Sequence, residues 1–156
     1  MPEYGREYWE ANNIQRRLTP EQLLDIAVGH REREDRLLLD SRDVFFIDTD
    51  ATTTAVFADY YHQSVSTDLQ VLVCDCEKRY DLVFLCLPDI PYDDTEDRSG
   101  EANREEFHQR VVDGLRASSR PYFELGGSLQ ERVSTVRKVL ASTKKYQNPH
   151  DWKINA

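Results

Sequence analysis

The chain has 156 residues, a length that fits one domain with a sizeable core. Its 29 acidic residues outnumber its 20 basic residues and give a net charge of −9, which disfavours non-specific binding to nucleic-acid phosphates. No signal peptide is evident, and no apolar run approaches the ~18 residues of a membrane span. These features predict a cytoplasmic protein with no nucleic-acid or membrane partner.

Three cysteines, Cys74, Cys76 and Cys86, show no spacing typical of a zinc site. Two fall in a predicted helix and one in a predicted buried strand, so we expect reduced core thiols.

The first residues run Glu3-Tyr4-Gly5-Arg6-Glu7, and a helix is predicted from Arg6 onward. Glu3, Tyr4 and Arg6 would then lie at the mouth of a sheet, where a substrate could be held. From residue types alone, a frayed amino terminus is the favoured alternative.

A second helix is predicted from Thr19 toward Asp40, because Thr19 and Gln22 can form a capping box around Pro20. Gly29 and His30 interrupt its pattern, and His30 is expected to be a partly exposed helix residue rather than a ligand. Residues 31–36 are expected to form a solvated charged face.

Residues 44–47 are apolar without alternation and are followed by Asp48, Thr49 and Asp50. Such a run predicts a parallel strand buried on both faces, with both aspartates at its carboxyl end, where α/β sheets bind ligands. The following threonines, 52–54, could cap a helix. A strand that merely ends in an aspartate at a turn is an equally open interpretation.

In the rest of the chain, the residue pattern predicts helices around 56–61 and 68–78, an apolar strand over 82–87 and a short strand over 121–125. The acidic segment 91–100 is a candidate lid, with an ordinary surface loop as the alternative. A helix over 101–117 follows it, and Ser128 with Glu131 forms another capping box before a last helix. One domain over 1–143 and a polar tail over 144–156 are expected.

Several of these stretches occur in the same order as in a known family. The runs 3–7, 27–30 and 46–50, with Thr53 and Thr54, resemble the ribosylnicotinamide kinase domain of bifunctional bacterial NAD-salvage regulators, a P-loop kinase family. The lid resembles it through Pro91-Tyr92, Arg98 and Asn103-Arg104, although Tyr92 and residues 95–98 depart from the common pattern. Residues 121–124 with Glu131 and Arg132 extend the resemblance to about residues 2–140.

The resemblance implies an α/β, three-layer P-loop kinase-like fold, a parallel sheet with helices on both faces, truncated at the N-terminus. It implies transfer of the γ-phosphate of ATP to the 5′-hydroxyl of nicotinamide riboside, with Mg²⁺. Asp48 would hold the metal or orient the hydroxyl, and Arg98 and Arg104 would close over the phosphates. Glu3, Tyr4, Arg6 and Asp50 would face the nucleoside. A homo-oligomer is an open alternative for the assembly.

One departure outweighs the others: the chain contains no Gly-x-x-x-x-Gly-Lys-Ser/Thr loop. In the family, the strand before this loop lies between the strands that correspond to residues 44–47 and 82–87. Its removal would leave two unpaired edges, or would force these strands to pair directly or with another chain. We therefore expect a shortened kinase-like domain that is inactive as it stands. The alternatives are a non-catalytic nucleoside-binding module and a P-loop ATPase or GTPase-like switch.

Overall fold

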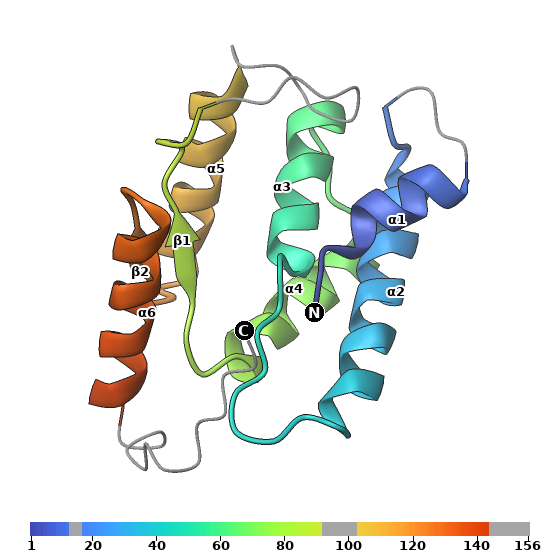
Figure 1. Ribbon diagram of the computed structural model, residues 1–156. Coiled ribbons are helices and arrows are strands. Elements are labelled where there is room, and N and C mark those ends of the chain that lie inside the picture. Colours follow the sequence, from blue (N-terminus) through green and yellow to red (C-terminus); the bar gives the residue numbers. More distant parts are fainter. Residues whose placement is uncertain (13–16, 92–102, 144–156) are drawn as a thin grey trace.

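A computed structural model describes residues 1–12, 17–91 and 103–143 (Figure 1). In chain order these form α1 (Tyr4–Ala11), α2 (Pro20–Leu38), α3 (Ala51–His62), α4 (Thr67–Arg79), β1 (Phe84–Cys86), α5 (Arg104–Ala117), β2 (Phe123–Leu125) and α6 (Leu129–Ser142). The fold is mixed α/β but mostly helical, with a small parallel sheet among the described residues.

Helix starts follow the polar caps that the sequence offers. Thr19 and Ser128 each form a capping box, with Gln22 and Glu131 as the reciprocal partners. Both of these predictions are confirmed. α3 starts differently from the prediction, because the side chain of Asp50 caps it by accepting from the N–H groups of Thr52 and Thr53. The threonines therefore donate backbone N–H groups rather than serving as the cap.

The main core lies where α2, α3 and α4 pack together. Small residues on α3 allow this close approach, since Ala51 and Ala58 are both buried in the cluster. Its other buried members are Leu23, Ala27, Leu69 and Cys76. This helical layer carries the start of α3 and therefore positions the aspartates that precede it.

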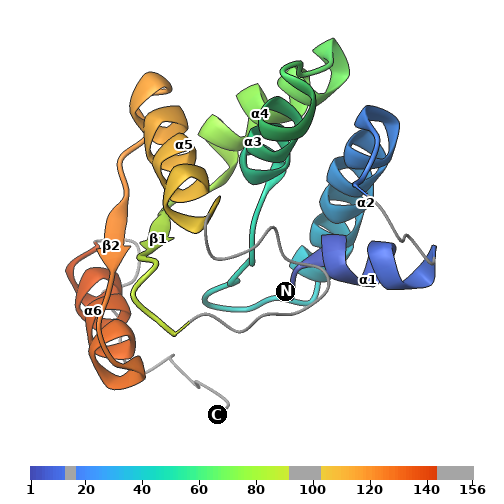
Figure 2. The same cartoon turned by 90° about the horizontal axis from the view of Figure 1, so that it is seen from above.

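A second core lies between the strands and α5, around Leu85, Val112 and Leu115. β1 pairs with β2 in parallel, with Leu85 opposite Glu124. Figure 2 shows α6 on the side of these strands opposite to α5. The parallel pairing and the helices on both faces match the expected layering, but the ladder holds two strands among the residues described.

Residues 44–47 do not form the predicted strand. They run as an extended trace (Figure 1), and Phe46 is 54% exposed, so burial on both faces is wrong for this segment. Their backbone partner is the first residue: the Met1 amino group donates to the Phe46 carbonyl, and the Asp48 N–H donates to the Met1 carbonyl at 2.9 Å. This is the pattern of a parallel bridge between Met1 and Ile47.

The extended segment and β1 run in the same direction but do not pair with each other. Figures 1 and 2 place residues 44–48 between the chain start and β1, and β2 lies on the far side of β1. No backbone hydrogen bond joins the segment to β1 within the described ranges. The sequence analysis left open that residues 44–47 and 82–87 pair directly with each other. The structure shows that this alternative is wrong.

Three other expectations need correction. α2 is continuous through Gly29, and His30 is 5% exposed rather than partly exposed. Residues 31–36 were expected to be a solvated charged face. Glu34 within them is only 2% exposed, because α4 and Tyr80 cover it. Cys76 is buried, but Cys74 and Cys86 are exposed; all three are free thiols. In the part of the chain described, no helix is long and apolar enough to cross a membrane.

Candidate functional site

Asp48 lies at the carboxyl end of the extended segment, with its side chain exposed. Thr49 follows in the left-handed region, at φ 64°, and turns the chain into α3. The buried ring of His30 contacts the turn, with its Nε2 3.2 Å from the Asp48 carbonyl oxygen. The Asp48 carboxylate thus projects from a turn whose backbone is held on two sides, by Met1 and by His30.

The Asp50 carboxylate is hydrogen-bonded to other parts of the protein on both of its oxygens. One carboxylate oxygen accepts from the α3 backbone, and the other accepts from Arg120 Nη1 at 3.1 Å. The same Arg120 nitrogen lies 3.1 Å from the Thr52 hydroxyl, and the Asp50 and Arg120 side chains are 15% and 8% exposed. Sequence reasoning missed Arg120, because it stands in a turn before the last strand and carries no motif.

The beginning of α1 lies against α2. The Tyr4 ring covers Gly29, where an added Cβ would lie only 2.6 Å from ring atoms, and the Arg33 guanidinium sits 4.6 Å from the ring centroid. Glu3 is the N-cap residue of α1, and Arg6 is exposed on its first turn. The structure thus brings Tyr4 and the Asp48 backbone to neighbouring residues of α2, Gly29 and His30, near the middle of that helix.

A buried polar network lies behind this region. The Glu34 carboxylate pairs with Arg79 and accepts from the Tyr80 hydroxyl at 2.8 Å. It also lies 3.9 Å from His30 Nδ1, so the network reaches the ring that supports Asp48. Burial, together with the Cys76 thiol and the Glu34 carboxylate, raises the pKa of Tyr80 well above its usual value. The phenol therefore stays a hydrogen-bond donor at neutral pH.

Of the two predicted lid arginines, the structure describes one. Arg98 lies outside the described residues, and so does most of the segment 91–100. Arg104 is the first residue of α5 and is half-buried. Its expected role toward phosphates stays a prediction.

Asp89 follows β1 and is fixed by the start of α6. It accepts from the Gly127 N–H at 2.5 Å and pairs with Arg132, and these contacts lower the pKa of its carboxyl group. Arg132 is buried and also donates to the Leu125 carbonyl at 2.7 Å. This cluster ties the ends of β1 and β2 together, so we assign it to the architecture of the sheet.

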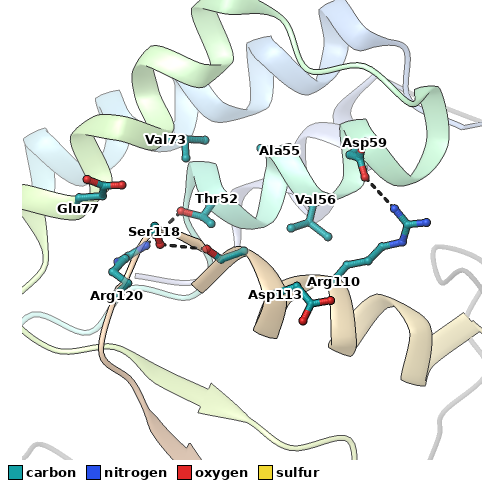
Figure 3. A pocket seen from close by; sticks show the side chains of 11 residues that line it. Thr52, Ala55, Val56, Asp59, Val73, Glu77, Arg110, Asp113, Ser118 and Arg120 are labelled. Carbon is teal, nitrogen blue, oxygen red and sulfur yellow. Dashed lines mark hydrogen bonds and ion pairs between the residues drawn. The ribbon is translucent and has the colours of Figure 1, made fainter. Parts of the chain in front are cut away.

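A groove of about 340 Å³ runs between α3, α4 and α5 (Figure 3). Its floor is apolar, with Ala55, Val56 and Val73, and an arginine lies at each end. At one end Arg110 donates to Asp59 at 2.7 Å; at the other Arg120 contacts Thr52. Because both arginines already have carboxylate partners, the groove offers no free cation to an anionic ligand.

The resemblance implies Mg²⁺ and ATP, and the side chains fit these groups only in part. An exposed carboxylate such as Asp48 could supply one oxygen ligand to Mg²⁺, which commonly takes one or two protein carboxylates. No group of three His, Cys, Asp or Glu side chains suited to a metal occurs among the described residues. The loop N–H groups and lysine that hold a triphosphate are not in this sequence, so we derive no step through ATP.

Comparison with known families gives a match over most of the chain. The family model AAA_28, described as an AAA domain, matches residues 1–132. The chain belongs to this AAA-domain family. The family is P-loop NTPase-like, in agreement with the parallel strands, the helices on both faces and the aspartates after residues 44–47. No curated protein gives a significant match.

Proposed function

We propose that this AAA domain is a nucleoside-kinase-like phosphotransfer domain whose nucleoside side is present in the 156 residues. The reaction would be that of the nicotinamide riboside kinases it resembles, transfer of the γ-phosphate of ATP to a nucleoside 5′-hydroxyl. The observation that carries the proposal is the exposed Asp48 carboxylate at the end of an extended segment, on a turn whose backbone is held by Met1 and by His30.

In this proposal the predicted site residues have distinct roles, and that of Asp50 changes from contact with the nucleoside to support of the turn. Asp48 orients the attacking hydroxyl, for which an exposed carboxylate with a fixed backbone is suited. Glu3, Tyr4 and Arg6 face the nucleoside, and Arg98 and Arg104 approach the phosphates from the lid. Asp50 contributes through the α3 cap and its pair with Arg120, which set the direction of the preceding turn.

The 156-residue chain should not carry out the reaction alone. A triphosphate brings several negative charges to a protein whose net charge is already −9. Without loop N–H groups, the loop lysine and the helix start that follows it, little offsets this charge. A chain given a strand, a Gly-x-x-x-x-Gly-Lys-Ser/Thr loop and a helix ahead of Met1 should gain ATP binding and turnover.

The second candidate is a non-catalytic nucleoside-binding module, which the lack of the loop in this sequence favours. Calorimetric titration of the chain with nicotinamide riboside and, separately, with ATP distinguishes the two. Nucleoside binding that persists in the extended chain without turnover would support the module. ATP hydrolysis by the extended chain that does not depend on a nucleoside would instead support an NTPase switch.

A further inference from the structure

The groove between α3, α4 and α5 is separate from the candidate site and from the strands. Figure 2 shows α2, which carries the contacts to Asp48, and α5 on opposite sides of α3. α5 lies between the groove and β1 (Figure 3). The volume of the groove, about 340 Å³, is at the lower end of the range for small-ligand sites, so it suits a small molecule.

The middle of the groove is apolar and hollow. Ala55 and Val56 of α3 and Val73 of α4 form its floor. On the α5 wall, a Cβ added to Gly114 would meet nothing within 4 Å, so this wall leaves open space over the floor. Methylene groups of a ligand would gain favourable burial here, whereas a charged group would lose its hydration without finding a partner.

The end of the groove at Arg110 carries more negative than positive charge. The Arg110 guanidinium lies 2.7 Å from an Asp59 carboxylate oxygen and 3.0 Å from a Glu106 carboxylate oxygen. One cation thus faces two carboxylates, and Asp113 adds a third on the α5 wall. A second cation would complement this end.

The opposite end has the same imbalance. Arg120 pairs with Asp50 at 3.1 Å, and Glu77 lies at the same end of the groove (Figure 3). Within the described ranges Glu77 makes no hydrogen bond or ion pair, so its carboxylate is available. α5 ends here at Ala117, and the negative end of its helix dipole also favours a cation.

The two ends are separated by a distance that α3 defines. Thr52 lines the groove at the Arg120 end, and Asp59 lies two turns further along the same helix, at the Arg110 end. At ~1.5 Å per residue, the ends are roughly 10 Å apart. An extended chain advances about 3.5 Å for every three bonds, so about nine bonds cover this distance. A linear molecule with eight methylene groups between two amino groups has this length.

We propose that the groove binds a linear aliphatic diamine with an apolar middle and an ammonium group at each end. One ammonium group lies at Glu77, the other lies between Asp59 and Glu106, and the methylene groups cover the apolar floor. The site is independent of Asp48 and of the proposed reaction, so neither result decides the other.

Calorimetric titration of the 156-residue chain at low ionic strength tests the proposal with octamethylenediamine as the probe. We expect saturable binding of one molecule per chain. Putrescine is too short to reach both ends and octylamine has one charge, so each should bind about threefold more weakly or worse, as loss of an exposed ion pair gives. Spermidine has the same length but a charge over the apolar floor, and it should also bind more weakly.

Equal affinity for the four amines would overturn the proposal, because the negative net charge of the chain alone would then account for binding. Absence of saturable binding to octamethylenediamine would overturn it as well.

Two substitutions test the location of the site. Glu77→Gln removes one end charge and should weaken binding of octamethylenediamine about threefold. Glu32→Gln makes the same change at an exposed position of α2, outside the groove, and should leave the affinity unchanged. Gly114→Leu fills the hollow without changing the charge and should abolish saturable binding in a chain whose thermal unfolding stays cooperative.

Unchanged binding in Glu77→Gln or in folded Gly114→Leu would contradict the proposal, and so would an equal loss in Glu32→Gln. Glu77 is exposed, so Glu77→Gln leaves the packing intact and decides the test even if Gly114→Leu does not fold.

Discussion

Arg120 donates to Asp50 across 70 positions of sequence, with 3.1 Å between Nη1 and Oδ2. The pair joins the turn before β2 to the first turn of α3, and the Arg120 guanidinium also lies 5.4 Å from the centre of the Tyr80 ring. Two halves of the domain that share no strand pairing within the described residues are thus connected beneath the candidate site.

Removing this contact should destabilise the chain strongly. In Arg120→Ala, the mostly buried Asp50 carboxylate loses its cationic partner, and we expect a loss of about 3 kcal/mol in the free energy of unfolding. Urea denaturation measures it. Arg116→Ala is the control, since Arg116 is 66% exposed and 4.0 Å from Asp113; it should change stability by less than about 0.5 kcal/mol. Equal effects of the two substitutions would contradict the role of the Arg120 pair.

Tyr80→Phe tests the network behind the site. Loss of the hydroxyl that donates to Glu34 should cost about 1 to 2 kcal/mol at neutral pH. Since burial raises the pKa of Tyr80 in the folded state, the neutral phenol stabilises the fold fully below about pH 10, and this stabilisation is lost as the pH rises further. The parent should therefore lose more stability than Tyr80→Phe between about pH 10 and 12. Parallel pH slopes in denaturation experiments would argue against a buried neutral phenol.

Two helical glycines offer a matched pair of substitutions. An added Cβ at Gly29 would meet the Tyr4 ring at 2.6 Å, whereas at Gly114 it would meet nothing within 4 Å. We expect Gly29→Ala to destabilise the chain by about 1 to 2 kcal/mol and Gly114→Ala to stabilise it by about 0.5 to 1 kcal/mol. Thermal unfolding measures both. The cost of Gly29→Ala should vanish in a Tyr4→Ala background, and a cost that persists there would show that Tyr4 does not pack on Gly29.

Sequence reasoning succeeded where the determinants are local. The caps at Thr19 and Ser128 depend on residues three positions apart, and both form as predicted. The segment 44–47 is a different case, because apolar composition indicates a buried strand only when partner strands lie on both sides. Here Met1 is the backbone partner that the described residues provide, and Phe46 lies on a face where it is 54% exposed.

The motif residues of the candidate site could be predicted from the sequence, but the residues that hold them in place could not. Asp48 and residues 3–6 could be selected from short runs, and the fold brings Tyr4 and Asp48 to neighbouring residues of α2, Gly29 and His30. Arg120 and Glu34 act through contacts with residues 70 and 45 positions away, and no local pattern distinguishes them from surface charges. For the same reason the burial of His30 could not be inferred from its place in a charged stretch.

The lid role can be tested in the extended chain described above. Arg104→Ala should lower kcat by about 100-fold, because it removes a cation expected to offset charge in the transition state. Steady-state kinetics with ATP and nicotinamide riboside measure this. Arg116→Ala, on the same helix, should stay within about threefold of the parent. An Arg104→Ala variant equally close to the parent would exclude the role.

The central claim is that the 156 residues carry the nucleoside side of a kinase-like domain without its triphosphate site. The most direct measurement is an ATP-to-ADP assay with nicotinamide riboside, run in parallel on the 156-residue chain and on the chain extended by a strand, P-loop and helix. We predict no measurable turnover for the first and nicotinamide-riboside-dependent turnover for the second. Robust turnover by the 156-residue chain alone, or none by a folded extended chain that binds ATP, would contradict this claim.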